Sequence, residues 1–132
     1  MKIVNFGSLN IDYVYTVPHF VRPGETLAAV RRDIFPGGKG LNQTTALTRA
    51  LGKASGIEIC IAGGIGKNDG AILKQAIIDM NVDTALLGEY DAPSGHTFIQ
   101  VDASGQNSIV YYPGTNKMHT KDFVDAVLAY FS

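Results

Sequence analysis

The residues most able to do chemistry lie in a glycine-rich stretch, Pro-Gly-Gly-Lys-Gly-Leu-Asn, at positions 36–42. Glycines before a helix let the backbone turn sharply and approach a ligand without a Cβ atom in the way. The helix expected to follow presents unpaired N–H groups and the positive end of its dipole at this point. Lys39 adds a positive charge, and Asn42 adds an amide that can donate and accept. With Gly38 at the bend, the stretch suits a polar ligand rich in oxygen atoms.

The glycine–lysine pairs at 38–39 and 66–67 do not fit a nucleotide-binding loop. A phosphate-binding loop requires Gly-x-x-x-x-Gly-Lys followed by Ser or Thr, but Gly40 follows Lys39 and Asn68 follows Lys67. The glycines at 63–66 also miss the dinucleotide-binding spacing, because Asp69 occupies the third glycine position. We interpret residues 63–70 as a turn between a strand and a helix, with Asn68 or Asp69 near the start of the helix.

A second polar group, Gly-Ser-Leu-Asn-Ile-Asp at 7–12, follows the first apolar run of the chain. Asn10 and Asp12 are two positions apart, which places both side chains on one face of an extended segment. A carboxylate can accept from two neighbouring hydroxyls, while an amide both donates and accepts. The pair therefore suits a sugar, although Asn and Asp after a strand are also common turn residues.

Apolar periodicity predicts alternating strands and helices. Short apolar runs indicate buried strands at 3–6, 57–62 and 82–87. Helical spacing predicts helices at 39–51, 69–80 and 120–131, the last capped by Thr120 and with Phe123, Val124, Val127, Leu128 and Phe131 facing inward. This order predicts an α/β fold with a parallel, Rossmann-like sheet and crossover helices.

Four more polar extended segments do not fit that alternation. They lie near 12–17, 26–35, 97–101 and 108–112. We expect them to form a small accessory β-sheet that projects from the main layer. The chain stops directly after a helix, where a strand should come next, so we expect it to be the front half of a longer fold.

Composition limits the class of protein. Of the 132 residues, 45% are hydrophobic and 17% are charged, which predicts a folded core within one domain or part of one. The net charge of −1 argues against a nucleic-acid-binding surface. A single cysteine, no targeting segment and no membrane-length apolar run predict a cytoplasmic protein. The three histidines are isolated, so no metal site is predicted.

Four segments together resemble the ribokinase-like carbohydrate kinases, also called the PfkB type. They are residues 7–12, Pro-Gly-Glu-Thr at 23–26, Gly-Gly-Lys-Gly-Leu-Asn-Gln at 37–43 and Pro-Gly-Thr-Asn at 113–116. The resemblance runs over nearly the whole chain and is greatest to the ribokinase branch. It implies a ribokinase-like fold, with the accessory strands as a lid, and transfer of the ATP γ-phosphate, with Mg²⁺, to a sugar hydroxyl. Phosphofructokinase-like and nucleoside kinases of the same family stay open as alternatives.

The resemblance also implies site residues and partners. Asn10 and Asp12 are expected to bind the hydroxyls of a sugar such as ribose. Gly38, Lys39 and Asn42 are expected to complete the pocket. The lid strands of the family pair two subunits, which implies a homodimer. No membrane or nucleic-acid partner is expected.

The family's second signature, a Gly-Ala-Gly-Asp-type motif, does not occur in these residues. That motif carries the catalytic base, and the ATP pocket belongs to the same half, so we expect residues 1–132 to be a substrate-binding part with no catalytic residue and no activity alone. A non-catalytic sugar-binding or dimerising regulatory module is the alternative. Among the histidines, His96 is the best candidate for a sugar neighbour. Arg31 and Arg32 are expected on a solvated lid face or a dimer contact.

Overall fold

The centre of the fold is a parallel three-stranded sheet. In the computed structural model, which describes residues 1–52 and 56–130, the strands β1 (Lys2–Phe6), β4 (Glu58–Gly66) and β5 (Leu87–Tyr90) lie in the order β1-β4-β5. Both pairings are parallel. The predicted α/β architecture with a parallel sheet and crossover helices is confirmed.

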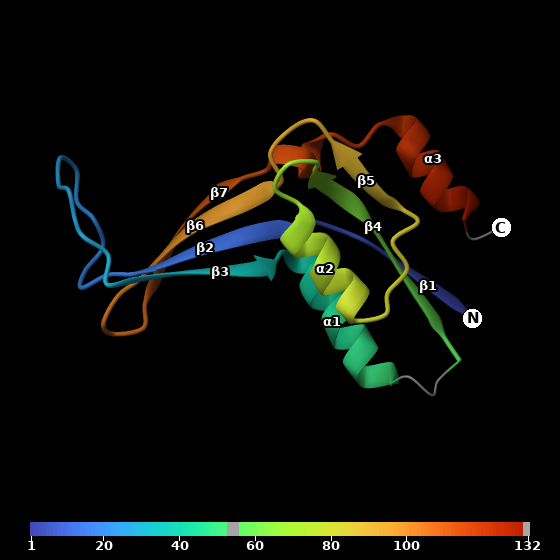
Figure 1. Ribbon diagram of the computed structural model, residues 1–132, viewed down its shortest axis with the longest axis horizontal. Coiled ribbons are helices and arrows are strands. Elements are labelled where there is room, and N and C mark those ends of the chain that lie inside the picture. Colours follow the sequence, from blue (N-terminus) through green and yellow to red (C-terminus); the bar gives the residue numbers. More distant parts are fainter. Residues whose placement is uncertain (53–55, 131–132) are drawn as a thin grey trace.

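Helices pack on both faces of this sheet. α1 (Lys39–Leu51) and α2 (Ala71–Asp79) lie side by side (Figure 1). α3 (Lys121–Ala129) packs against the other face, where the ring centroids of Phe123 and Phe6 are 5.9 Å apart. Successive side chains of a strand point to opposite faces, so each face of the sheet presents its own apolar row to its own helices.

The main core lies between the sheet and the pair α1 and α2. Its buried apolar residues come from both helices, from β4, from the connection between α2 and β5, and from the segment where β1 continues into the second sheet. They are Leu9, Ile11, Leu41, Ile61, Ile65, Leu73, Ile77 and Val82. Among the described residues, no helix is both long enough and apolar enough to cross a bilayer.

A second sheet has four strands in the order β3-β2-β6-β7. They are β2 (Asn10–Thr16), β3 (Arg31–Gly37), β6 (Gly95–Val101) and β7 (Asn107–Tyr112). β2 is antiparallel to β3 and parallel to β6, so the sheet is mixed. Figure 1 shows this projecting sheet extending away from the helices, with the β2–β3 connection at its far end. It is the accessory sheet that the sequence predicts.

Of the turn predicted at 63–70, residues 67–70 form a turn before α2, whereas the glycines at 63–66 form the end of β4. A Cβ atom on Gly63 would lie 2.9 Å from Gly7 O, and one on Gly64 would lie 2.9 Å from Thr115 O. Glycine in a strand allows another backbone to approach closely. These glycines therefore serve tertiary contacts, and α2 begins after them.

The predicted strand at 26–35 is shorter than expected. Residues 26–30 lie outside β3, which begins at Arg31. The N–H of Val30 donates to Thr16 O at 2.8 Å, where the chain joins the ladder. Residues 26–30 therefore belong to the connection between β2 and β3 and not to a strand.

The predicted strand at 82–87 is also displaced. Within it, Asp83 makes an isolated bridge to Cys60, and β5 starts only at Leu87. The N–H of Leu87 donates to Thr84 O at 3.0 Å. The Leu87 N–H and the Thr84 carbonyl are bonded to each other in this turn, so they are not available to extend the pairing with β4.

α3 has the predicted cap but not the whole predicted inward face. Thr120 Oγ1 accepts from the N–H of Phe123 at 3.2 Å, as an N-cap residue does. Val127 is buried, whereas Leu128, expected to face inward, is 60% exposed. Phe131, at the end of the predicted helix, lies outside the described residues.

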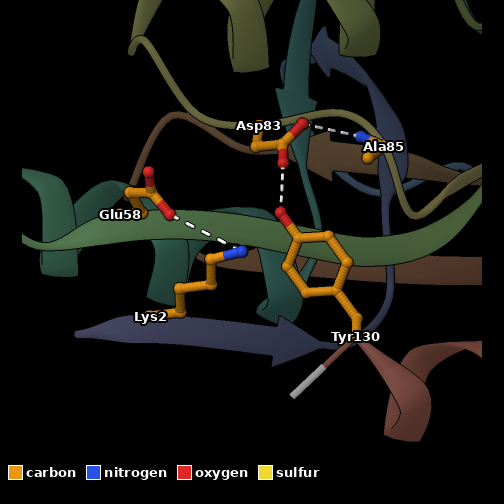
Figure 2. A network of polar contacts seen from close by, with 5 residues as sticks. All are labelled: Lys2, Glu58, Asp83, Ala85 and Tyr130. Atoms are coloured by element: carbon orange, nitrogen blue, oxygen red, sulfur yellow. Dashed lines mark hydrogen bonds and ion pairs between the residues drawn. The ribbon is translucent and has the colours of Figure 1, made fainter. Parts of the chain in front are cut away.

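Tyr130 fastens the end of α3 to the parallel sheet. Its hydroxyl donates to Asp83 Oδ2 at 2.5 Å, and Asp83 Oδ1 accepts from the N–H of Ala85 at 2.9 Å (Figure 2). Lys2 Nζ lies 4.7 Å from the centre of the Tyr130 ring and 3.8 Å from Glu58 Oε2. The bond from Tyr130 lowers the pKa of Asp83 and raises the pKa of Tyr130 to about 12.

Replacing Tyr130→Phe should raise the pKa of Asp83 toward the ordinary value of about 3.9. Because folding lowers this pKa, the contribution of Asp83 to stability is present above the ordinary value and is lost as pH falls through the lowered value. An NMR titration of the Asp83 carboxyl carbon in both proteins measures the change. An unchanged pKa would show that the N–H of Ala85, and not Tyr130, is the dominant donor.

Candidate functional site

The glycine-rich bend lies against the start of β2, where the two sheets join. Gly38 is the N-cap of α1 and has a φ of 95°. A Cβ atom on it would lie 2.6 Å from Ser8 O and 2.9 Å from the backbone nitrogen of Asn10. The N–H of Gly40 donates to Ser8 O at 3.0 Å, and the N–H of Lys39 donates to Ser8 Oγ at 3.2 Å. The bend is held directly against the backbone from which Asn10 projects.

Asp12 leans from β2 toward this bend. Its Oδ1 accepts from Thr97 Oγ1 at 2.6 Å. Its Oδ2 lies over Gly37, so close that a Cβ atom there would overlap it at 2.1 Å. Within the described part of the chain, Oδ2 has no hydrogen-bond donor of its own. Asp12 thus keeps one acceptor oxygen for a ligand.

Two aromatic side chains flank Asp12 on the same face of the projecting sheet. Asp12 is opposite Phe35 on β3 and Thr97 on β6, and Thr97 is opposite Tyr111 on β7. Residues directly opposite one another share a face. Phe35 and Tyr111 are 51% and 49% exposed. Asp12 and Thr97 thus lie between two aromatic side chains. This arrangement suits a ligand that has both hydroxyl groups and apolar C–H groups.

Asn10 lies on the same face, nearer the core. Its strand neighbours are Gly37 and Gly95, so no side chain covers it from either side. Its Oδ1 accepts from Asn116 Nδ2 at 2.8 Å. The carbonyl end of the Asn10 amide is therefore engaged by the protein, and its N–H groups are the part left for a ligand.

Lys39 and Asn42 stand in the first turn of α1, and both are exposed. The N–H of Asn42 donates to Gly38 O at 2.9 Å, which is the first hydrogen bond of the helix. The helix start therefore adds the positive end of a dipole and a full positive charge to this region. All five predicted site residues lie around one junction, where the starts of β2 and α1 meet.

His96 does not join this group. It is opposite Ile11 in the register, on the face of the projecting sheet turned away from Asp12, and its ring centroid lies 5.1 Å from that of Tyr112. The structure therefore does not support His96 as a ligand neighbour. Arg31, 70% exposed at its side chain, pairs with Asp33 at 2.7 Å, as a solvated face would allow.

Thr97 and Asn116 are polar members of the site that the sequence analysis did not identify. Thr97 reaches Asp12 only through the register of two strands far apart in the sequence. Asn116 belongs to the segment 113–116, which the sequence analysis singled out by resemblance alone and without a role. No local spacing could have linked either residue to β2.

His119 borders the site on the side of α3. Its ring stacks on Phe123 with 4.8 Å between centroids, meets Phe6 edge-on at 5.2 Å, and has Nδ1 3.3 Å from the Tyr90 hydroxyl. Burial lowers the pKa of His119, because the charged ring is poorly solvated there. Burial under α3 therefore favours the neutral form of the ring.

The junction adjoins a small cavity of about 180 Å³. This cavity is lined by Phe6, Gly7, Ser8, Asn116 and His119, and none of the five predicted site residues lines it. A larger cavity of about 800 Å³ lies at the opposite end of β1 and β4, beside Tyr130, and none of the five predicted site residues lines it. Over residues 1–52 and 56–130, no three acidic, histidine or cysteine side chains gather as a metal site would require.

Comparison with known proteins identifies the family. The description "pfkB family carbohydrate kinase" matches residues 1–132. The chain belongs to the pfkB family of carbohydrate kinases. The junction of bend and strand is therefore part of a carbohydrate kinase fold, and the expected ribokinase-like architecture is confirmed by the solved relatives.

Ribokinases are among the relatives. Ribokinase from Haemophilus influenzae is 38% identical over 119 residues, which are 89% of this chain and 37% of that protein. The ribokinase structure from Thermotoga maritima has a TM-score of 0.84 at 34% identity, covering 96% of this chain and 41% of that one. Arabidopsis thaliana ribokinase, complexed with ribose and ATP, has a TM-score of 0.77 at 25% identity, with 96% and 41% covered. The chain spans about two fifths of the length of these relatives.

Substituting Gly95→Ala should destabilise the junction by about 1–3 kcal/mol, the usual cost of overpacking. The new Cβ atom would lie 2.0 Å from Asn116 Nδ2 and 2.6 Å from Asn10 Oδ1. Chemical denaturation measures the loss. The exposed Ser108→Ala on β7 is the matched control and should change stability by less than about 0.5 kcal/mol. Equal effects of the two substitutions would contradict the close packing at Gly95.

The stability of the chain should fall as pH drops below about 6.5, the ordinary pKa of histidine. Because burial lowers the folded-state pKa of His119, the unfolded chain takes up its proton first, and the contribution is lost as pH falls through the lowered value. His119→Phe keeps the ring packing and should flatten this dependence, as measured by denaturation between neutral and mildly acidic pH. An equally steep dependence in the variant would assign the effect to another group.

Proposed function

We propose that residues 1–132 form the sugar-binding face of an ATP-dependent carbohydrate kinase of the ribokinase branch, with ribose or a close relative as substrate. The observation that carries this proposal is the junction itself. A free carboxylate oxygen of Asp12 and free N–H groups of Asn10 face the same side as the start of α1.

Each group has a separate task in binding the sugar. Asp12 accepts from a sugar hydroxyl, and Asn10 donates to a neighbouring one or to the same one. Gly38 leaves the backbone bare, so that the sugar can approach the start of α1. Lys39 and Asn42 complete the pocket from the helix, where they meet the oxygen atoms that point toward the positive dipole end.

We propose that the projecting sheet serves as the lid of this site. Closing it would remove water from the sugar, which phosphoryl transfer requires to avoid hydrolysis of ATP. The same sheet carries exposed apolar side chains on β6 and β7, which supports pairing of two lids in a homodimer. On the face turned away from Asp12, these side chains are Phe98, Val110 and Tyr112.

ATP and Mg²⁺ belong to the proposed reaction but not to the described residues. No glycine–lysine pair of the sequence is followed by Ser or Thr, as a phosphate-binding loop requires, and β4 carries its glycines for close packing. We assign the catalytic base and the nucleotide pocket to the part of the whole protein that corresponds to the remainder of the relatives. The Arabidopsis relative is complexed with ribose and ATP, which supports these two molecules as the reactants. A cytoplasmic location fits a supply of ATP.

In the intact protein, Asp12→Ala should weaken ribose binding by about a hundredfold. A hydrogen bond to a carboxylate contributes about 1.5–3 kcal/mol, and a loss of about 3 kcal/mol, at the upper end of this range, corresponds to about this factor. Isothermal titration calorimetry with ribose measures the affinity. Asp33→Ala is the matched control, because Asp33 lies on the same face further along β3 and pairs with Arg31. It should leave the affinity unchanged.

An assay of ribose-dependent ADP formation by the intact protein then tests the reaction. Ribose binding together with ADP formation supports the kinase. Binding without ADP formation would identify a non-catalytic sugar-binding module in its place. Unchanged affinity in the Asp12 variant would remove Asp12 from the site, whatever the reaction.

A further inference from the structure

The side-chain amide of Asn116 lies at the centre of the junction. It is carried by a short 3-10 helix, Gly114–Lys117, that follows β7. Its Oδ1 accepts from the N–H of Leu9 at 3.0 Å, and its Nδ2 lies 3.3 Å from Leu9 O. The amide thus pairs with both backbone groups of Leu9, as a neighbouring strand would do, at the residue before β2 begins.

The remaining hydrogen-bonding capacity of Asn116 is directed at Asn10. An amide has two N–H donors and one carbonyl acceptor. The acceptor is taken by Leu9, and Nδ2 donates at 2.8 Å to Asn10 Oδ1, its shortest contact. The Tyr111 hydroxyl, at 3.2 Å, is a further partner of Nδ2. Because Leu9 fixes which end of Asn116 carries the nitrogen, it also fixes which end of Asn10 must carry the oxygen.

The backbone at Gly95 packs closely on both amides. A Cβ atom on Gly95 would lie 2.0 Å from Asn116 Nδ2 and 2.6 Å from Asn10 Oδ1, so the Gly95 backbone packs directly on both side chains. Pro113 O would be 2.9 Å from the same Cβ position. The pair is therefore enclosed by the start of β6 and the end of β7.

We propose that Asn116 is a positioning residue that holds the Asn10 amide in one orientation, so that Asn10 offers only N–H donors to the sugar. This inference rests on the proposed function for the identity of the ligand. The site would then present both kinds of hydrogen-bonding group on one face, which are an acceptor oxygen of Asp12 and the N–H donors of Asn10. A hydroxyl satisfies both, because it donates one proton and accepts through its lone pairs.

Asn116→Asp tests the orientation directly. The new carboxylate keeps an acceptor for the N–H of Leu9 but offers no donor to Asn10, so the Asn10 amide must turn over and present its carbonyl oxygen to the ligand. Loss of a ligand hydrogen bond should weaken ribose binding by about tenfold in the intact protein. Asn107→Asp is the matched control, since it makes the same charge change at the exposed far end of β7. It should have no effect on affinity.

A double-mutant cycle separates positioning from a structural role. If Asn116 acts through Asn10, then Asn116→Asp in an Asn10→Ala background should change ribose affinity by less than about twofold. Full additivity of the two losses would overturn the proposal, because it would mean that Asn116 acts through the fold alone. Asn116→Ala, which adds no charge, repeats the cycle if the first variant does not fold.

Side-chain amide exchange in the sugar-free intact protein, measured by NMR with ¹⁵N-asparagine, tests the orientation without a ligand. The protons of Asn116 should exchange slowly and those of Asn10 rapidly. Equal rates would overturn the proposal. A wild-type protein that binds no ribose would refute the proposed function, while the exchange rates would still decide whether Asn116 orients Asn10.

Discussion

The structure depends on one close contact between backbones, where the bend before α1 crosses the segment between β1 and β2. A Cβ atom on Gly40 would lie 2.6 Å from the carbonyl carbon of Gly7, and one on Gly7 would lie 2.7 Å from Gly40 Cα. A side chain at either position would push α1 away from the strands. Because both segments lead directly into the site, this contact sets the separation between the positive helix start and the polar residues of β2.

A second set of contacts couples the projecting sheet to the core. Ser94, buried just before β6, donates through Oγ to Asp69 Oδ1 at 2.6 Å and accepts from the N–H of Gly66 at 2.8 Å. Beyond β7, Thr115 Oγ1 donates to Gly64 O at 3.0 Å. The residues just before β6 and just after β7 are thus hydrogen-bonded to the end of β4 or to the turn that follows it. Any closure of this sheet over a ligand must pivot about these points, close to the site.

Local signals predicted the features that local physics decides. The helix predicted at 39–51 has the observed bounds, because glycines before it and Gly52 after it define both ends. The glycines at 63–66 were misread, since glycine serves a turn and a close strand contact equally well, and only the tertiary packing distinguishes the two uses. The same holds for the site. The polar residues of 7–12 were identified from the sequence, but the place of Thr97 and the face on which His96 lies depend on strand register. A slip of one residue in register moves every side chain of a strand to the other face.

At the junction, Asp12 offers an acceptor and Asn10 offers donors. This arrangement explains selectivity for a hydroxyl group better than it explains affinity. A hydroxyl can serve Asp12 and Asn10 together, whereas a carbonyl group serves only the donor and an ammonium group only the acceptor. Each such bond replaces one to water, so it contributes only about 0.5–1.5 kcal/mol for neutral partners on an exposed face. Tight binding therefore requires that water be excluded from the junction, where the same bonds become stronger. In the proposed site, the fixed amide of Asn10 and the glycine bend would select the ligand, and the surfaces that cover them would set its affinity.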